Sequence, residues 1–199
     1  MSSEGSRGSG DDDKDVVSPH NVVYFCDRMK AINKNMTEVF MRINNIETSR
    51  LILRGFTKED ALWAYSIWNN PEMGQYLPDE AKEEIDDEYL KMLEGLGEDD
   101  ECCYLIPVFK DSLERVGTCS FMISDDKKVY DIAYCVHKKY WCQGYATEIA
   151  QGMIDYARGQ GAEKVTIFVG QENAASNRVA QKCGGKIVSE NKKKKRGTD

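Results

Sequence analysis

"YWCQGYATEIAQGMIDYA", residues Tyr140–Ala157, sets a glycine in front of a run whose apolar residues recur at helical spacing. This pattern predicts an amphipathic helix that begins near Ala146. Gly144 lies at the turn before it, where a missing Cβ permits unusual backbone angles and lets another molecule approach the main chain. The unpaired N–H groups and partial positive charge of a helix N-terminus suit a phosphate or pyrophosphate. The stretch therefore predicts an anion site, and a tight packing turn is the alternative.

Three segments before this stretch predict an antiparallel meander. Their connections, "DSL" and "DDK", have the length and residues of hairpin turns. The expected strands are "ECCYLIPVFK" (101–110), "ERVGTCSFMIS" (114–124) and "KVYDIAYCVHK" (128–138). Further strands are expected at 50–56, 164–170 and 185–191, with a helix over 173–183 between the last two. The spacing implies crossover connections, so the sequence predicts an α/β fold with a mixed, mostly antiparallel sheet and helices on both faces.

Two helices are expected between the first of these strands and the meander. The first covers 57–70, where Thr57 and Asp60 form a near capping box and Pro71 ends the helix. The second covers 79–97 and closes at a pair of glycines. From Asp79 to Glu101 the chain carries twelve acidic residues against two lysines. A solvated helix face explains this acidity, and a local field that attracts cationic ligands is the functional alternative.

Composition limits the class of protein. A chain of 199 residues and 22.6 kDa has room for one core and an extension. No apolar run approaches the about 18 residues of a membrane span, and the N-terminus lacks a signal peptide, so a cytoplasmic protein is expected. Seven cysteines without an export signal favour reduced thiols. No cysteine or histidine cluster has the spacing of metal ligands, so no metal site is expected.

The ends of the chain are expected to lie outside the folded domain. Residues 1–20 are rich in Ser, Gly and Asp, and "GSGDDDK" within them resembles an artificial linker. We therefore expect an N-terminal extension over 1–46, in part disordered or artificial, a domain over 47–190 and a basic tail over 191–199. The "KKKKR" of the tail suits nucleic acid, but a solubilising end is the commoner role of such a segment.

The order of these motifs resembles the GNAT superfamily of N-acetyltransferases, which bind acetyl-coenzyme A (acetyl-CoA). "ETSRLILRGFTKEDA" is similar to the opening strand and helix of the branch that includes ribosomal-protein N-terminal acetyltransferases and related small-amine acetyltransferases. "DIAYCVHKKYWCQGYATE" resembles the cofactor-binding strand and pyrophosphate loop of that branch, and "ENAASNRVAQKCG" resembles its following helix. The likeness covers about residues 47–189.

The resemblance implies a cofactor site at the glycine turn. The pyrophosphate would lie on the loop from Trp141 to Ala146, and the pantetheine would pair with the backbone of Tyr134–His137 where two parallel strands splay. Trp141 stands where the family usually has a basic residue or Gln, which leaves Gln143 as the polar arm, and Cys142 replaces a common Gly. The implied cofactor-binding residues are Cys135, Val136, His137, Trp141, Gln143, Gly144, Tyr145, Ala146, Thr147, Asn173, Ser176 and Lys182.

Two features depart from the family pattern. Gly185 stands where the family has Phe, so an aromatic packing contact is missing. The sequence also ends soon after the sixth core strand, where the family continues through a seventh strand that forms a hairpin with it. A missing terminal strand is therefore expected, either because the sequence is truncated or because another segment fills that edge. The "NVVYFC" stretch, Asn21–Cys26, is a possible filler.

The reaction implied by the resemblance is the direct attack of an amine on the acetyl thioester. An alkyl amine, with a pKa of about 10, must first lose a proton. Asp131 on the central strand is the candidate base, directly or through water, and a carboxylate without a chemical role is the alternative. A backbone N–H of Cys135–His137 is the expected oxyanion donor. Ser176 is the candidate partner of the leaving thiolate, because Ala180 stands where much of the superfamily has Tyr.

The resemblance thus predicts an acetyl-CoA-dependent N-acetyltransferase. The acceptor would be a primary amine on a protein N-terminus, a polyamine or a small molecule, and the acidic segment favours a cationic one. We expect a monomer or homodimer without membrane or nucleic-acid partners. The alternative is a catalytically inactive GNAT-like module that senses acyl-CoA, which the two departures would explain. No Gly-Lys-Ser/Thr phosphate loop is present, which argues against a nucleotide-binding protein.

Overall fold

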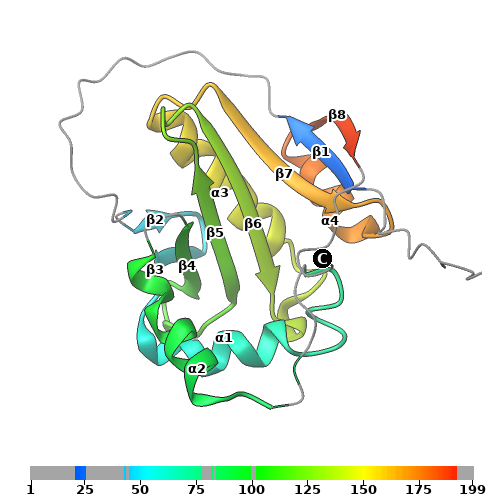
Figure 1. Ribbon diagram of the computed structural model, residues 1–199. Helices are drawn as coiled ribbons and strands as arrows, with labels where there is room; N and C mark the ends of the chain where they lie inside the picture. The colour runs from blue at the N-terminus through cyan, green and yellow to red at the C-terminus, as the bar shows by residue number, and fades with distance from the viewer. Residues whose placement is uncertain are drawn as a thin grey trace, which may run out of the picture.

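The computed structural model describes residues 21–25, 43, 45–77, 82, 84–99 and 102–191, of which 21–25 and 189–191 are described by their backbone alone. Within these residues the strands form one eight-stranded sheet in the order β2-β3-β4-β5-β6-β7-β1-β8 (Figure 1). The strands are β1 (Asn21–Phe25), β2 (Ile46–Glu47), β3 (Leu51–Gly55), β4 (Cys102–Phe109), β5 (Gly117–Ile123), β6 (Val129–Val136), β7 (Lys164–Gly170) and β8 (Lys186–Asn191).

The central meander and the crossover after it are confirmed. Strands β4, β5 and β6 pair antiparallel in sequence order, with Gly117 opposite Val136 at one end of the β5–β6 ladder. Strands β6 and β7 pair in parallel and are joined by α3 (Tyr145–Gly159). The fold class is therefore the predicted α/β fold with a mixed, mostly antiparallel sheet.

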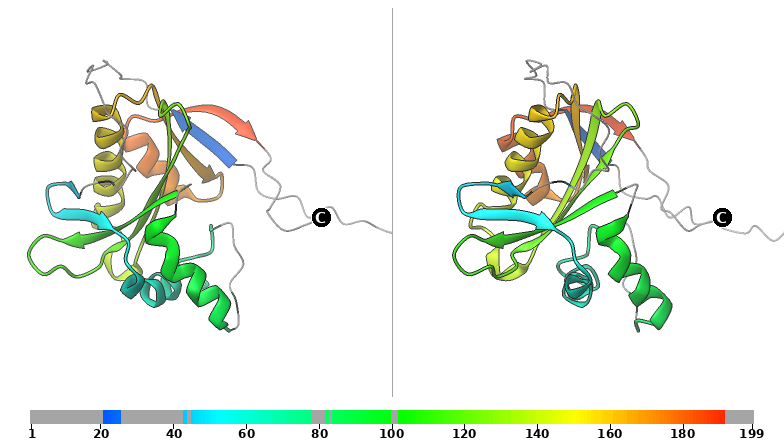
Figure 2. Two further views of the ribbon diagram at one scale, coloured as in Figure 1. Left: turned by 60° about the vertical axis from the view of Figure 1, so that its left-hand side comes forward. Right: turned by 90° about the vertical axis from the view of Figure 1, so that its left-hand side faces the viewer.

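Helices cover both faces of the sheet, and each face has its own core (Figure 2). On one face, α3 and α4 (Ala174–Lys182) pack over residues such as Leu105 of β4. On the other face, α1 (Ala61–Trp68) and α2 (Asp87–Glu94) pack over Ile106 and Val108 of the same strand. This division follows from the alternation of side chains along a strand. Short 3₁₀ segments η1 (Lys58–Asp60), η2 (Gly95–Glu98) and η3 (Lys138–Tyr140) complete the set of described helices.

The helix starts follow their capping residues. Thr57 donates its backbone N–H to Asp60 Oδ2 at 2.9 Å, which confirms the predicted capping box. The prediction of one helix over 79–97 is wrong within the described residues. There the α-helix begins at Asp87, eight residues after the expected start, because the side chain of Asp86 accepts the Tyr89 N–H at 2.7 Å and caps the helix. The helix ends at Glu94 with the expected Gly95 as its C-cap, and the 3₁₀ segment η2 follows directly.

Strand β1 occupies a place between β7 and β8. It pairs antiparallel with both, so that Val23 lies opposite Phe168 of β7 and Ser189 of β8. Residues 21–25 therefore belong to the sheet and not to an extension outside it. The expected gap beside β8 is filled by residues 21–25 of the "NVVYFC" segment, which agrees with the second of the two explanations given above. Of the expected extension over 1–46, residues 1–20, 26–42 and 44 lie outside the described residues, and Ile46 begins β2. Of the expected tail over 191–199, Asn191 ends β8 and residues 192–199 lie outside the described residues.

No helix in the described part of the chain has the length and apolar character needed to cross a membrane. Among the same residues, no group of three or more His, Cys, Asp or Glu side chains is placed to hold a metal ion.

Candidate functional site

Strands β6 and β7 stop pairing partway along their length, and we refer to the gap between their separated backbones as the slot. The two strands pair over three residue positions only, from Val129 opposite Lys164 to Asp131 opposite Thr166. Beyond this point β6 continues to Val136 and β7 to Gly170, and Figure 1 shows the two strands diverging. Separated parallel strands leave backbone groups on both inner edges unpaired with each other, so an extended ligand can lie between them.

The glycine turn lies at the open end of this slot. Gly144 is the N-cap of α3 and has a left-handed conformation, with φ of 83°. Cys142, two residues earlier, also has a positive φ of 58°, which is unusual for a residue with a Cβ. The N–H groups of Tyr145, Ala146 and Thr147 belong to the first turn of α3, where an α-helix supplies no acceptor. N–H groups at a helix start can bind an anion, and we call this turn the Gly144 cradle.

Arg50 ties the loop to the helix behind it. Its Nε donates to Glu148 Oε2 at 2.6 Å, its Nη1 donates to the carbonyl of Gln143 at 3.3 Å, and its guanidinium lies 4.0 Å from the ring centre of Tyr145. Thr48 Oγ1 donates to the other oxygen of Glu148 at 2.7 Å. Burial would raise the pKa of Glu148, but the hydrogen bonds from Thr48 and Arg50 outweigh it and the pKa is lowered.

Two of the expected cofactor-binding side chains make hydrogen bonds within the loop. Trp141 Nε1 donates to the carbonyl of Val136 at 2.6 Å, and Gln143 Nε2 donates to the carbonyl of Lys139 at 3.1 Å. The side chain of Gln143 therefore folds back onto its own loop, and Arg50 is the cation that lies beside the glycine turn. An ideal Cβ at Gly144 would lie 3.7 Å from Arg50 Nη2.

The backbone of β6 presents alternate residues to the slot. His137 donates its N–H to the carbonyl of Val116 on the β5 side at 2.9 Å. Hydrogen-bonded pairs alternate in an antiparallel ladder, so the backbone of Cys135 also points to β5, while the backbones of Tyr134 and Val136 point toward β7. The expectation that Cys135 and His137 offer backbone groups to the pantetheine or the oxyanion is therefore wrong. Of the three expected residues 135–137, only Val136 has its backbone directed toward the slot.

Two hydroxyl groups meet at the side of the slot. Ser176, in the first turn of α4, lies 2.8 Å from the phenol oxygen of Tyr134 on β6. Asn173 is the N-cap of α4, and its Oδ1 accepts the N–H of Ser176 at 3.0 Å. Asn177 joins α4 to the end of β7 by donating to the carbonyls of Gly170 and Asn173. The structure thus brings the expected residues Asn173 and Ser176 together and adds Tyr134, which the sequence reading assigned to backbone pairing alone.

Asp131 lies on the opposite face of β6 from these hydroxyls. Its Oδ1 accepts a hydrogen bond from Thr166 Oγ1 at 3.1 Å, at the last paired position before the strands part. Residues 131, 133 and 135 share one face of the strand, and Tyr134 shares the other with the buried Ile132. Asp131 therefore stands at the closed end of the slot and is about 10 Å along the strand from Tyr134.

Cys135 belongs to the same face as Asp131 and contacts the loop after α1. Its Sγ lies 3.6 Å from the carbonyl of Met73, and burial raises the pKa of its thiol to about 11. A thiol that stays protonated is a poor nucleophile, which argues against an acyl-enzyme at this residue. The remaining expected cofactor-binding residue, Lys182, is exposed at the end of α4. The next residue, Cys183, contacts α3, because its Sγ lies 3.8 Å from the carbonyl of Thr147.

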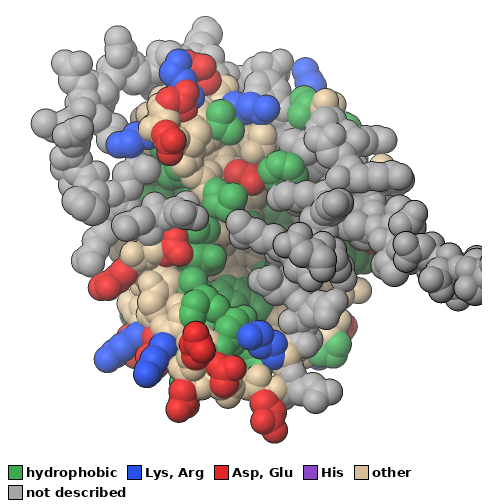
Figure 3. All heavy atoms as spheres, viewed as in Figure 1, with side chains coloured by type: hydrophobic (Ala, Val, Ile, Leu, Met, Phe, Trp, Pro, Cys, Tyr) green, Lys and Arg blue, Asp and Glu red, His purple; other side chains and the backbone are tan. Residues whose placement is uncertain are grey.

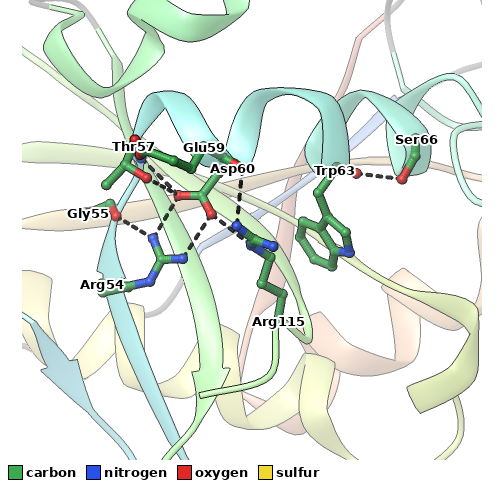
Figure 4. Close-up of polar contacts among 8 residues, drawn as sticks. All are labelled: Arg54, Gly55, Thr57, Glu59, Asp60, Trp63, Ser66 and Arg115. Carbon is green, nitrogen blue, oxygen red and sulfur yellow. Dashed lines mark hydrogen bonds and ion pairs between the residues drawn. The ribbon is translucent and has the colours of Figure 1, made fainter. Parts of the chain in front are cut away.

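A buried carboxylate fixes α1 on this face of the sheet (Figure 4). Asp60 is fully buried and binds the guanidinium of Arg54 through both oxygens, at 2.7 and 2.8 Å, and Nε of Arg115 at 2.8 Å. Burial would raise the pKa of Asp60, but the hydrogen bonds from Arg54, Thr57 and Arg115 lower it to about 2. One carboxylate thus joins the start of α1 to β3 and to Arg115, two residues before β5.

Acidic side chains gather at the end of the molecule that carries α1 and α2 (Figure 3). Those exposed in the described part of the acidic segment are Glu84, Asp86, Asp87, Glu88, Glu94, Glu98 and Asp99. The segment is tied to the end of α1, because Asn69 exchanges hydrogen bonds with the backbone of Lys82. The loop after α1 then reaches β6 through Met73. Acidic surface therefore borders the face of the sheet on which Asp131 lies.

Most of the chain matches the sequence profile of one known protein family. Residues 50–186 match the sequence profile described as "Acetyltransferase (GNAT) domain". A curated relative, the uncharacterized N-acetyltransferase p20 of Bacillus licheniformis, is 27% identical over 117 residues, which cover 57% of this chain and 66% of p20. The chain thus spans just under two thirds of the length of p20.

Two solved structures share the fold. An acetyltransferase (GNAT family) from Bacillus anthracis aligns with a TM-score of 0.62 at 20% identity, covering 71% of this chain and 82% of the other. A spermidine N-acetyltransferase from Vibrio cholerae, solved in complex with CoA and spermine, aligns with a TM-score of 0.61 at 18% identity, covering 68% and 80%.

Proposed function

Because the chain belongs to the acetyltransferase (GNAT) family, we propose that it transfers an acetyl group from acetyl-CoA directly to a primary amine. The observation that carries this proposal is the position of the Gly144 cradle at the open end of the slot between β6 and β7. A diphosphate on the first turn of α3 would direct the attached pantetheine into the slot. Its thioester would then point toward the closed end, where Asp131 lies.

The donor would be held mainly by backbone groups. The N–H groups of Tyr145, Ala146 and Thr147 would bind the diphosphate, and the slot-facing backbone of β6 would pair with the pantetheine. The same edge of β6 supplies N–H groups for the oxyanion that forms when the amine attacks. We assign this role to the backbone N–H of Tyr134, which faces β7 between Asp131 and the open end, in place of that of His137, which is already bound to Val116.

The two faces of the sheet would supply the two proton transfers. The amine would approach from the α1 and α2 face, where Asp131 removes a proton through a water molecule. The sulfur would leave beside Ser176 on the α4 side, where a hydroxyl stabilises the developing thiolate. The placement of Asp131 and Ser176 on opposite faces of the sheet supports this division, because the amine adds to one face of the planar thioester while the sulfur departs as a separate substituent of the tetrahedral carbon.

A cationic amine is the acceptor that the surface favours. The acidic segment borders the face from which the amine would enter, so its field would concentrate polyamines or basic N-terminal segments. A polyamine acceptor is supported by the fold shared with the spermidine N-acetyltransferase that binds spermine. A protein N-terminus is supported by the likeness of "ETSRLILRGFTKEDA" to the ribosomal-protein branch.

The test is a panel assay that follows the release of free CoA thiol from acetyl-CoA. Spermine, spermidine, a basic peptide with a free N-terminal Ser, its N-acetylated form and a neutral peptide serve as acceptors, and mass spectrometry identifies the acetylated product. We expect thiol release with at least one cationic amine and none with the blocked peptide. CoA binding by calorimetry together with a flat panel would favour the acyl-CoA-sensing module instead.

A further inference from the structure

The hydroxyl pair of Tyr134 and Ser176 solves a chemical problem that Ser176 alone leaves open. The leaving thiolate of CoA must gain a proton, and an ordinary thiol has a pKa of about 8.5. An aliphatic hydroxyl is a much weaker acid than a thiol, so it can donate a hydrogen bond to the sulfur but cannot give up its proton outright. A phenol, with an ordinary pKa of about 10, is within about two units of the thiol.

The geometry joins these two groups in series. The phenol oxygen of Tyr134 lies 2.8 Å from Ser176 Oγ, a hydrogen-bond distance. The Asn173 cap fixes the backbone of Ser176 from one side, and β6 fixes Tyr134 from the other. Ala180, one turn further along α4, is fully buried and has no hydroxyl, so that position cannot supply a proton to the slot.

We propose that Tyr134 is the net proton source for the leaving thiolate and acts through Ser176, an inference that rests on the proposed function. As the amine nitrogen bonds to the acetyl carbon and the C–S bond breaks, its electron pair passes to the sulfur. Ser176 gives its proton to the sulfur and receives the proton of the Tyr134 phenol. The tyrosinate that remains regains a proton from the one that the attacking nitrogen releases to water, so protons balance over the cycle.

The proposal makes the side chain of Tyr134 a positioning and proton-supplying group and gives its hydroxyl no part in holding the cofactor. Removal of its hydroxyl should therefore lower kcat and leave CoA affinity unchanged. Because the two hydroxyls act as one unit, removing both should cost no more than removing the more important one. A tyrosine that only packs against α4 would instead change affinity and stability together.

The experiment compares Tyr134→Phe, Ser176→Ala and the double variant, with acetyl-CoA as donor and spermine as acceptor, or the Ser-initiated peptide if spermine is not acetylated. Tyr130→Phe is the matched control, because Tyr130 lies on the same face of β6 but packs in the core against Phe121. We expect kcat to fall about 100-fold in Tyr134→Phe, with the dissociation constant of CoA within about twofold of the parent. We expect the double variant to match the slower single variant.

The alternative outcomes are distinct. Parent-like kcat in Tyr134→Phe, a parallel loss of kcat and CoA affinity, or additive losses in the double variant would each overturn the relay while the proposed function stands. A parent enzyme that binds CoA and acetylates no amine in the panel would remove the proposed function and the relay together.

Discussion

At the scale of single residues, the loop depends on Arg50 as much as on its own sequence. One guanidinium contacts the helix through Glu148, the loop through the Gln143 carbonyl and the first helical residue through the Tyr145 ring. The backbone N–H of Arg50 also donates to Glu148 Oε1 at 2.6 Å. In the proposed function this arrangement would order the loop before CoA arrives, which would lower the cost of ordering it on binding.

Replacing Arg50 by Met should therefore weaken the binding of CoA. The variant keeps the length of the side chain and removes the ion pair, the carbonyl contact and the positive charge beside Gly144. We expect the dissociation constant to rise about tenfold or more, equivalent to about 1.4 kcal/mol. Isothermal calorimetry measures it. Lys128→Met is the control, because Lys128 forms an exposed ion pair with Glu163 just before β6 begins, at the closed end of the slot. Its loss should not change the affinity for CoA.

The sequence could predict the local geometry of some candidate residues. Gly144 and Asn173 lie at helix starts and Ser176 lies in a first turn, because these positions follow from the order of neighbouring residues. Arg50 and Tyr134 could not be assigned in this way. Their partners Glu148 and Ser176 lie 98 and 42 residues away, so the contacts exist only once the sheet and both helices have assembled. The direction of the His137 backbone, away from the slot, likewise depends on the pairing of β6 with the β5 side, where His137 donates its N–H to Val116.

At the scale of elements, Asp60 anchors α1 to the sheet. A fully buried carboxylate between two arginines stabilises the fold only while all three partners are present. Its loss would leave two guanidinium groups facing each other without a counter-charge. In the proposed site the amine enters beside α1 and the loop after it. The ion pairs of Asp60 would therefore also position the elements that border the entering amine.

Asp60→Asn should lower the free energy of unfolding by about 3–5 kcal/mol at neutral pH. The pKa of Asp60 falls from 3.8 to about 2 on folding, so its ionised form stabilises the protein above about pH 4. This contribution of about 2–3 kcal/mol is lost as pH falls from about 4 toward 2. Urea unfolding at several pH values should show a shallower acid dependence in the variant. The neighbouring exposed residue gives the control, Glu59→Gln, and equal acid dependence in Asp60→Asn and the parent would contradict this role.

The acidic surface around α2 gives a second test at this scale. Glu84→Gln, Asp87→Asn, Glu88→Gln and Glu94→Gln remove four exposed charges, and Asp86 is kept because it caps the helix. We expect the KM for spermine to rise about threefold or more at low salt, while the KM for acetyl-CoA stays constant. The difference should shrink near about 0.5 M salt, where the Debye length is only a few ångströms.

A control of equal charge separates a local field from net charge. Four exposed acids outside the acidic segment are replaced by their amides, at Glu47, Asp125, Asp155 and Glu163. These changes should leave the KM for spermine near that of the parent. If both quadruple variants behave alike, the acids around α2 form a solvated helix face without a role in acceptor binding.

At the scale of the whole molecule, the sheet is continuous because β1 joins its two parts. Strand β8 pairs with β1 and has no direct ladder with β7, and β7 is one wall of the slot. The meander, the crossover and the order of helices could be predicted from patterns along the chain. The place of β1 could only be raised as one possibility, because its pairing with β7 joins residues about 145 positions apart, such as Val23 and Phe168.

Val23→Pro tests this placement. A strand that is paired on both sides cannot accept proline, which lacks the N–H and clashes within the ladder. We expect the free energy of unfolding to fall by about 3 kcal/mol or more. Hydrogen exchange should accelerate in β7 and β8, and CoA affinity should fall because β7 lines the slot. Urea unfolding, exchange mass spectrometry and calorimetry measure the three effects.

Val23→Thr is the matched control for the integrity of the strand. Threonine keeps the N–H and the β-branched shape, so stability should change by less than about 1 kcal/mol and exchange in β8 should match the parent. The contrast between the two variants at one position separates the backbone of β1 from its side chain. Parent-like exchange of β8 in Val23→Pro would show that β1 does not join β7 to β8 in solution, and β8 would then need another partner.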